Sequence, residues 1–263
     1  MQNWPIAGVK YAFIAMISIA ILTFFSNSNA QNDIVSKAHH TPTGFKNNYT
    51  PEVNKSFGDF LRWQWESWGI DKTANSPTPS VQADLALLKA PASPTVTWMG
   101  HATALVQANG LNVLVDPVFS ERASPVQIFG TDFHWYYAGD TGYSRDFADT
   151  ARQFAPRQTG ALGGGFDLAL VPVGSYEPRW FMSQQHVNPM ESVRIHQDVG
   201  AKRSIGVHWG TFALTDEPLD QPPRDLAIAR QVLDVKATDF GILAIGESRQ
   251  FDKRTPSTAL SAR

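Results

Sequence analysis

The hydrophobic pattern is clearest in the first half of the chain, where two apolar runs predict paired strands. Val96–Gln107 is apolar and β-branched enough for a strand, and Leu111–Val115 is a second, shorter run. Asn109 and Gly110 lie between the runs. Asn-Gly is the strongest short-range signal for a tight hairpin turn, because both turn positions require positive φ. We therefore predict a β-hairpin around these two residues.

The second half of the chain alternates apolar runs with segments of helical character. Phe166–Val173 is apolar throughout, which is typical of a strand covered on both faces. Asn188 is placed as a helix N-cap, with Pro189 at the first helical position and Gly200 just past the end. Further strands are predicted at 133–138, 204–207 and 241–245, and further helices at 148–154 and 224–233. This alternation predicts a layered α/β architecture.

Residues 56–69, SFGDFLRWQWESWG, carry large apolar side chains at helical spacing behind Ser56, which is placed as an N-cap. The apolar positions are Phe57, Phe60, Leu61, Trp65 and Trp68. Such a helix either faces lipid or packs its aromatic side chains onto the domain. Helices that bind anionic lipid usually carry lysine and arginine opposite the apolar stripe. This helix has no basic face, so packing onto the domain is the favoured interpretation.

Composition narrows the functional classes. The 263 residues are 43% hydrophobic and 17% charged, and the formal net charge is −2 without a basic run. Nucleic acid is therefore not an expected partner. Cysteine is absent, which excludes disulfides and thiolate metal ligands. Any metal ion must be held by histidine, aspartate or glutamate.

The N-terminus has the pattern of a targeting segment. Lys10 precedes the apolar run Tyr11–Phe25, and Ser28–Ala30 offers small residues for cleavage before Gln31. A run of 15 residues is short for a membrane span and suits the core of a signal peptide. We expect export to the periplasm, with an uncleaved inner-membrane anchor as the alternative.

Four segments follow from these patterns. They are a signal peptide or anchor at 1–30, a polar and aromatic approach segment with a linker at 31–94, the α/β domain at 95–250, and a polar tail at 251–263.

Polar side chains follow three of the predicted strands. Asp140 lies between two glycines, Gln185 and His186 lie in the loop after the central strand, and His208 leaves the strand at 204–207. Open α/β sheets place ligands at the carboxyl ends of their strands. On residue type alone, Asp140 is a turn residue and His208 a strand-end histidine bonded to backbone. The neighbouring motifs change that interpretation.

Several multi-residue blocks stand out along the chain: GHAT (100–103), DPVFSERASP (116–125), AGDTGY (138–143), GSYEPRWFMSQQHVNP (174–189), HWGTFAL (208–214) and GESR (246–249). In this order they resemble segments of the metallo-β-lactamase superfamily, and within it of the phospholipases D that hydrolyse N-acyl-phosphatidylethanolamine. Together they extend the resemblance over most of residues 39–249.

This resemblance implies an αββα sandwich with a centre of two zinc ions that hydrolyses a phosphodiester. Asp140 matches the carboxylate that bridges the metals, and His208 matches a terminal histidine ligand. Gln185 and His186 match positions that contact substrate. The implied substrate is an N-acyl phospholipid or a similar phosphodiester, and the implied surroundings include a membrane surface.

One part of the family pattern is absent. The central metal motif, His-x-His-x-Asp-His, occurs nowhere in the sequence. We predict that an internal block is missing between Gly130 and Thr131, which leaves a depleted sandwich with two secure ligands. A catalytic zinc usually needs three protein ligands, so activity is expected to be impaired and no residue is assigned as catalytic. His134 or His186 would have to be recruited, and their spacing does not indicate it.

Two alternatives to an impaired zinc hydrolase remain at this point. One is a non-catalytic lipid- or ligand-binding remnant that uses the 174–189 surface and the aromatic helix. The other is a deleted or mispredicted gene without a stable product. The remaining histidines, His101 and His196, are predicted to have structural roles.

Overall fold

The computed structural model describes residues 40–41, 44–45, 48–49, 55–116, 133–158 and 164–252. The chain divides into two compact units, Met1–Glu52 and Val53–Arg263. The first unit contains a hairpin of β1 (His40–Thr41) and β2 (Gly44–Phe45). The predicted targeting segment, the Gly130–Thr131 junction and the tail from residue 253 lie outside the described residues. In the part of the chain that is described, no helix is long and apolar enough to cross a membrane.

The second unit contains an antiparallel sheet in the order β10-β3-β4-β5. Its strands are β3 (Thr95–Gly100), β4 (Thr103–Ala108), β5 (Leu111–Val115) and β10 (Ser248–Gln250). The predicted turn between β4 and β5 is confirmed, since Asn109 and Gly110 have φ of 54° and 75°. The polar strand β10 pairs with β3 and was not predicted from its sequence, SRQ.

The prediction of one strand over Val96–Gln107 is wrong, because the chain reverses at Gly100 and His101. These residues have φ of 110° and 48°. One distant and one local contact hold the reversal. The His101 backbone N donates to Thr211 Oγ1 at 2.8 Å, and its O accepts from the nearby Trp98 Nε1 at 2.8 Å. His101 therefore has the structural role that was predicted for it, and it orders this junction through its backbone.

The other sheet has the order β6-β7-β8-β9, and all its strands are parallel. They are β6 (Trp135–Tyr137), β7 (Leu168–Pro172), β8 (Ser204–Val207) and β9 (Phe240–Ile242). Every residue from Leu168 to Val171 is 0% exposed, which confirms the prediction that this strand is covered on both faces.

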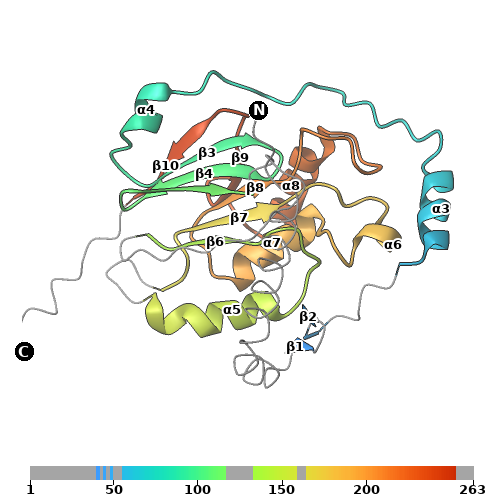
Figure 1. The fold of residues 1–263 in the computed structure, drawn as a ribbon, viewed down its shortest axis with the longest axis horizontal. Helices are drawn as coiled ribbons and strands as arrows, with labels where there is room; N and C mark the ends of the chain where they lie inside the picture. The colour runs from blue at the N-terminus through green and yellow to red at the C-terminus, as the bar shows by residue number, and fades with distance from the viewer. Residues whose placement is uncertain are drawn as a thin grey trace, which may run out of the picture. The chain divides into compact units, whose positions relative to one another are not determined.

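Helices pack against the parallel sheet. Helix α7 (Pro189–Asp198) contacts β7, and α5 (Asp146–Phe154) and α8 (Gln221–Val232) contact α7 (Figure 1). The predicted N-cap is confirmed as a capping box in which Asn188 Oδ1 accepts from the Glu191 backbone N at 2.9 Å. Helix α8 begins three residues earlier than predicted, because prolines are tolerated in the first turn of a helix, where no N–H is needed.

The two sheets share one hydrophobic core, which contains side chains from β3, β4, β6, β7 and β8. At its centre the Trp98 and Trp209 rings stack with centroids 5.1 Å apart. A short helix, α4 (Leu85–Lys89), is joined to the antiparallel sheet, because Gln107 Nε2 of β4 donates to Leu88 O at 2.8 Å. Helix, sheet, sheet and helix layers agree with the predicted αββα sandwich.

Helix α3 (Phe57–Glu66) begins at the predicted N-cap, where Ser56 and Asp59 form a capping box. The prediction that its aromatic side chains pack onto the domain is wrong. Trp65 and Trp68 are 78% and 84% exposed. The helix attaches through a different residue, because the Trp63 ring stacks on Phe181 with centroids 4.9 Å apart. The predicted stripe therefore faces solvent in the described unit.

Candidate metal centre

Three loops leave the same edge of the parallel sheet. Strands β6, β7 and β8 are parallel neighbours, so the loops that follow them start together at their carboxyl ends. These loops carry Asp140, His186 and His208, which are all residues that the sequence pattern singled out.

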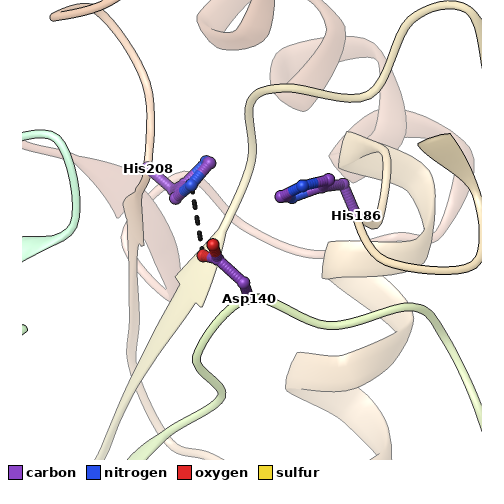
Figure 2. A group of neighbouring side chains, drawn as sticks. All are labelled: Asp140, His186 and His208. Atoms are coloured by element: carbon purple, nitrogen blue, oxygen red, sulfur yellow. Dashed lines mark ion pairs between the residues drawn. The ribbon is translucent and has the colours of Figure 1, made fainter. Parts of the chain in front are cut away.

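Asp140 and His208 form the core of the site. His208 Nε2 lies 3.1 Å from Asp140 Oδ1, as Figure 2 shows by a dashed line. The His208 side chain is 4% exposed and that of Asp140 is 52% exposed. His208 has φ of 62°, and its backbone N donates to His101 O at 2.8 Å. The histidine is thus fixed at the end of β8, while the carboxylate opens to solvent.

His186 joins this pair from the loop after β7. One potential ligand atom from each of Asp140, His186 and His208 lies within 4.8 Å of the other two. The centroids of the two imidazole rings are 5.3 Å apart, and Figure 2 shows the His186 ring pointing toward the other two side chains. The structure therefore brings two imidazoles and one carboxylate to a single point.

The backbone N and O of His186 both form hydrogen bonds. Its N donates to Met182 O at 2.9 Å, and its O accepts from Arg179 Nη1 at 2.8 Å. Arg179 also pairs with Glu191 Oε2 at 2.7 Å, which ties the loop to the capping box of α7. His186 is therefore positioned by the start of a buried helix.

Two glycines allow the loops to approach each other this closely. A Cβ on Gly174 would lie 2.4 Å from His208 O, and a Cβ on Gly142 would lie 2.5 Å from Gln184 O. Both contacts are with backbone, which cannot rotate away as a side chain would. Gly174 thus sets the distance between the loop after β7 and His208, and Gly142 sets the distance between the Asp140 loop and the His186 loop.

Replacing Gly174 by alanine is expected to lower the free energy of unfolding by about 1–3 kcal/mol, the usual cost of overpacking. The added Cβ must displace the His208 backbone, and urea denaturation of both proteins measures the loss. Gly164 is a matched control because a Cβ there meets no atom of the described residues within 4 Å. Gly164→Ala should change stability by less than about 0.5 kcal/mol. Equal stability of the two variants would contradict the close approach at Gly174.

The electrostatics of the site favour the protonation states that bind metal. Burial, and then the proximity of His208, lowers the pKa of His186 to about 4. Burial alone would raise the pKa of Asp140, but the hydrogen bond from His208 and the three nearby histidines bring it below its usual value. Near neutral pH the His186 imidazole is neutral and the carboxyl is ionised. These are the forms in which both residues act as ligands.

The donor set fits a divalent transition-metal ion. Two imidazoles and a carboxylate form the His₂-carboxylate combination found at catalytic zinc sites, where water takes the remaining position. Within the described residues, Nδ1 of His186 and of His208 are both buried and have no hydrogen-bond partner. No described contact fixes the tautomer of His186, so this ring can present a ligand nitrogen to a cation. His208 Nε2 already points at the Asp140 carboxylate as a donor, and a cation bound there would take the place of its proton.

The other residues considered from the sequence lie around this point or away from it. Gln185 is exposed, and its Oε1 accepts from Lys55 Nζ at 2.5 Å. The His101 ring lies against His208 with centroids 4.2 Å apart. His134 precedes β6, at the opposite end of the strand from Asp140. His196 is buried in α7, where its Nδ1 lies 2.8 Å from Ser204 Oγ, in agreement with a structural role.

Sequence reasoning did not find that His186 approaches the Asp140–His208 pair. The approach depends on the contact between Gly142 and Gln184, which joins loops that are far apart in the sequence. One signal was present: the GDTG and QQH segments both follow strands of the predicted sheet. The shared edge of a parallel sheet therefore indicates that His186 lies near Asp140, but it does not indicate the distance between the two side chains.

Comparison with known proteins shows which proteins this chain is similar to. Residues 121–209, which include Asp140, His186 and His208, match the model of the beta-lactamase superfamily domain. Over 124 residues the chain is 41% identical to N-acyl-phosphatidylethanolamine-hydrolyzing phospholipase D 1 of Caenorhabditis elegans, which covers 46% of this chain and 32% of that protein. Over 91 residues it is 40% identical to the mitochondrial N-acyl-phosphatidylethanolamine-hydrolyzing phospholipase D of Saccharomyces cerevisiae. This match covers 35% of this chain and 18% of that protein.

The chain thus spans about a third or less of the length of these two relatives. Among solved structures, it is similar to Igni18, a metallo hydrolase from Ignicoccus hospitalis, with 11% identity and a TM-score of 0.39, over 61% of this chain and 99% of that one. The sequence matches confirm the resemblance to the metallo-β-lactamase superfamily and, within it, to the phospholipases D named above.

Proposed function

We propose, from this chain's likeness to the metallo-β-lactamase superfamily, that it carries a zinc-dependent phosphodiester hydrolase site of the phospholipase D type. The proposed substrate is an N-acyl phospholipid or a similar phosphodiester. One observation carries the proposal: Asp140 and His208 lie 3.1 Å apart, within the segment that matches the family model. The relatives named for hydrolysing N-acyl-phosphatidylethanolamine support the substrate class.

Asp140 and His208 would hold the metal. A bound divalent cation would supply Lewis acidity, the property that makes water a nucleophile near neutral pH. The ionised Asp140 carboxylate provides the negative charge that such a cation requires. His208, almost fully buried, provides a nitrogen that faces the Asp140 carboxylate, and the hydrogen bond from its backbone N to His101 O anchors the main chain that carries the ring. The pair leaves the solvent-exposed side of Asp140 open to substrate and water.

Gln185 and Lys55 would receive the phosphodiester beside the metal. Lys55 Nζ contacts Gln185 Oε1 and lies 4.1 Å from the centroid of the Phe181 ring. This places an ammonium group at the margin of the site, where it attracts an anionic substrate. The Gln185 amide nitrogen is a donor suited to a phosphate oxygen. On this proposal the two side chains orient the phosphodiester, and neither transfers a proton.

A second candidate function is favoured by the exposure of helix α3. Within the helix, Phe57 and Trp65 are 74% and 78% exposed, and Trp68, just after the helix, is 84% exposed. Exposed aromatic clusters mark interaction sites with proteins or membranes. In this alternative the chain binds lipid without hydrolysing it, because ligands of the family motif are missing from the sequence.

Hydrolysis of vesicles that contain N-acyl-phosphatidylethanolamine tests both candidates in one assay. We expect zinc-dependent release of phosphatidate, slower than in relatives that carry the full metal motif. Removal of zinc with a chelator, or Asp140→Ala, should lower the rate of phosphatidate release at least about 10-fold. Loss of a residue that only supports a metal ligand already lowers activity by about 10–100-fold, and loss of the ligand or the metal should cost no less.

Asp71→Ala is the matched control, because Asp71 is exposed and its carboxylate accepts from the Thr73 backbone N in a local turn. It should leave the rate unchanged. Vesicle binding without phosphatidate release would overturn the hydrolase proposal and support the non-catalytic alternative. A protein that neither binds nor hydrolyses would remove both.

A further inference from the structure

The chain lacks the family motif that supplies most of the metal ligands, so a two-ion centre would be short of donors. A catalytic zinc site needs about three protein ligands. Asp140 and His208 provide two. Among the described residues, His186 has a nitrogen within 4.8 Å of a ligand atom of both Asp140 and His208. The family resemblance assigns His186 to the substrate.

We propose that His186 is the third metal ligand of this chain and that Asp140, His186 and His208 form a site for a single divalent transition-metal ion. This inference rests on the proposed function, because it concerns the same metal. It changes the role of His186 from substrate contact to ligand, and it changes the expected number of ions from two to one.

The geometry supports this role in two ways. The three candidate ligand atoms lie within 4.8 Å of one another, so an ion placed between them is near all three. The main chain at both histidines is anchored, because His186 has hydrogen bonds with Arg179 and Met182, and His208 has one with His101. The backbone that carries the two histidine ligands is therefore largely preorganised for a cation.

The ligand types indicate the class of ion. Two imidazole nitrogens and one carboxylate oxygen, without thiolate, suit Zn²⁺, Co²⁺ or Fe²⁺ rather than the oxygen-only sites of Ca²⁺ and Mg²⁺. Metal-bound histidines usually donate their other N–H to a carboxylate or carbonyl group. Nδ1 of His186 and of His208 have no such partner among the described residues. We therefore expect weaker affinity than at sites with such partners, by about 10–100-fold.

Metal binding to the full chain tests the inference without measuring activity. Titration with Co²⁺, followed by visible absorption, and with Zn²⁺, followed by calorimetry, should show one ion per chain. His186→Ala should weaken binding by at least about 10-fold and change the cobalt spectrum, since loss of a ligand exceeds loss of a supporting group.

Gln184→Ala is the matched control, because this neighbour is exposed and the atom that it presents to Gly142 most closely is its backbone O, which the substitution keeps. It should bind like the unaltered chain. Circular dichroism establishes that each variant is folded, and His186→Asn, which keeps a polar side chain of similar size, replaces His186→Ala if the alanine variant unfolds.

The outcomes separate this inference from the proposed function. If His186→Ala keeps full affinity and an unchanged spectrum, His186 is not a ligand, and the proposed hydrolase site stands without it. Tight binding of two ions would also overturn the single-ion site. If the unaltered chain binds no ion at all, the inference and the proposed function are both wrong.

Discussion

Replacing Trp98 by alanine should lower the free energy of unfolding by about 3–5 kcal/mol, the range for removing a large aromatic side chain from a packed core. Trp98 is 0% exposed, and its ring stacks on Trp209 at an interplanar angle of 15°. Its Nε1 also donates to His101 O at 2.8 Å. The substitution removes the packing against Trp209 and a partly buried hydrogen bond together. Urea denaturation, with the m-value checked for constancy, measures the loss.

Trp65→Ala is the matched control for this experiment, because it removes the same side chain from a position that is 78% exposed. Its effect on stability should stay below about 0.5 kcal/mol. A large loss in this control would show that helix α3 is covered by another part of the protein. Similar losses in both variants would contradict the core position of Trp98.

Replacing His208 by alanine should lower the affinity for Zn²⁺ by about 100-fold or more and remove the phosphodiesterase activity with it. Loss of a group that only orients a metal ligand lowers metal affinity by up to about 100-fold, and loss of the ligand itself should lower it at least as much. His208 is also the residue that links the other candidates, since it contacts the Asp140 carboxylate and lies beside the rings of His101 and His186. Calorimetric titration with Zn²⁺ measures the change.

His196→Ala provides the contrast, because this histidine is buried in α7 and contacts Ser204 instead of the site. Its removal should lower stability by about 1–3 kcal/mol, the cost of an unmatched buried hydroxyl, and leave zinc affinity unchanged. Zinc affinity that falls equally in both variants would mean that binding follows overall stability, and that His208 has no special role.

Much of this fold could be predicted from local sequence. Asn109-Gly110 fixed the hairpin, and Asn188 with Glu191 marked the start of α7, because turns and caps depend on residues next to each other. The strand at Leu168–Val171 was recognisable from its continuous apolar run. The positions of Asp140 and His208 at strand ends followed from the same reasoning.

The errors share a different physical origin. The reversal at His101 depends on a hydrogen bond with Thr211, which is distant in the sequence, and no local pattern predicts a positive φ at a histidine. The polar strand β10 is defined by its pairing with β3 and not by its own composition. Helix α3 has a stripe that predicts burial, yet its contact is made by Trp63 on another face. Tertiary contacts decided each of these cases.

The sequential order of the parallel sheet has a kinetic consequence. Adjacent strands of a hairpin meet within about 1–10 μs, whereas parallel neighbours must first close the long crossover between them. The hairpin of β4 and β5 should therefore form early, and β6, β7 and β8 should join later. The three candidate ligands come together only when both crossovers are closed. A metal ion would then bind a late species on the folding pathway, so added zinc should slow unfolding more than it accelerates folding.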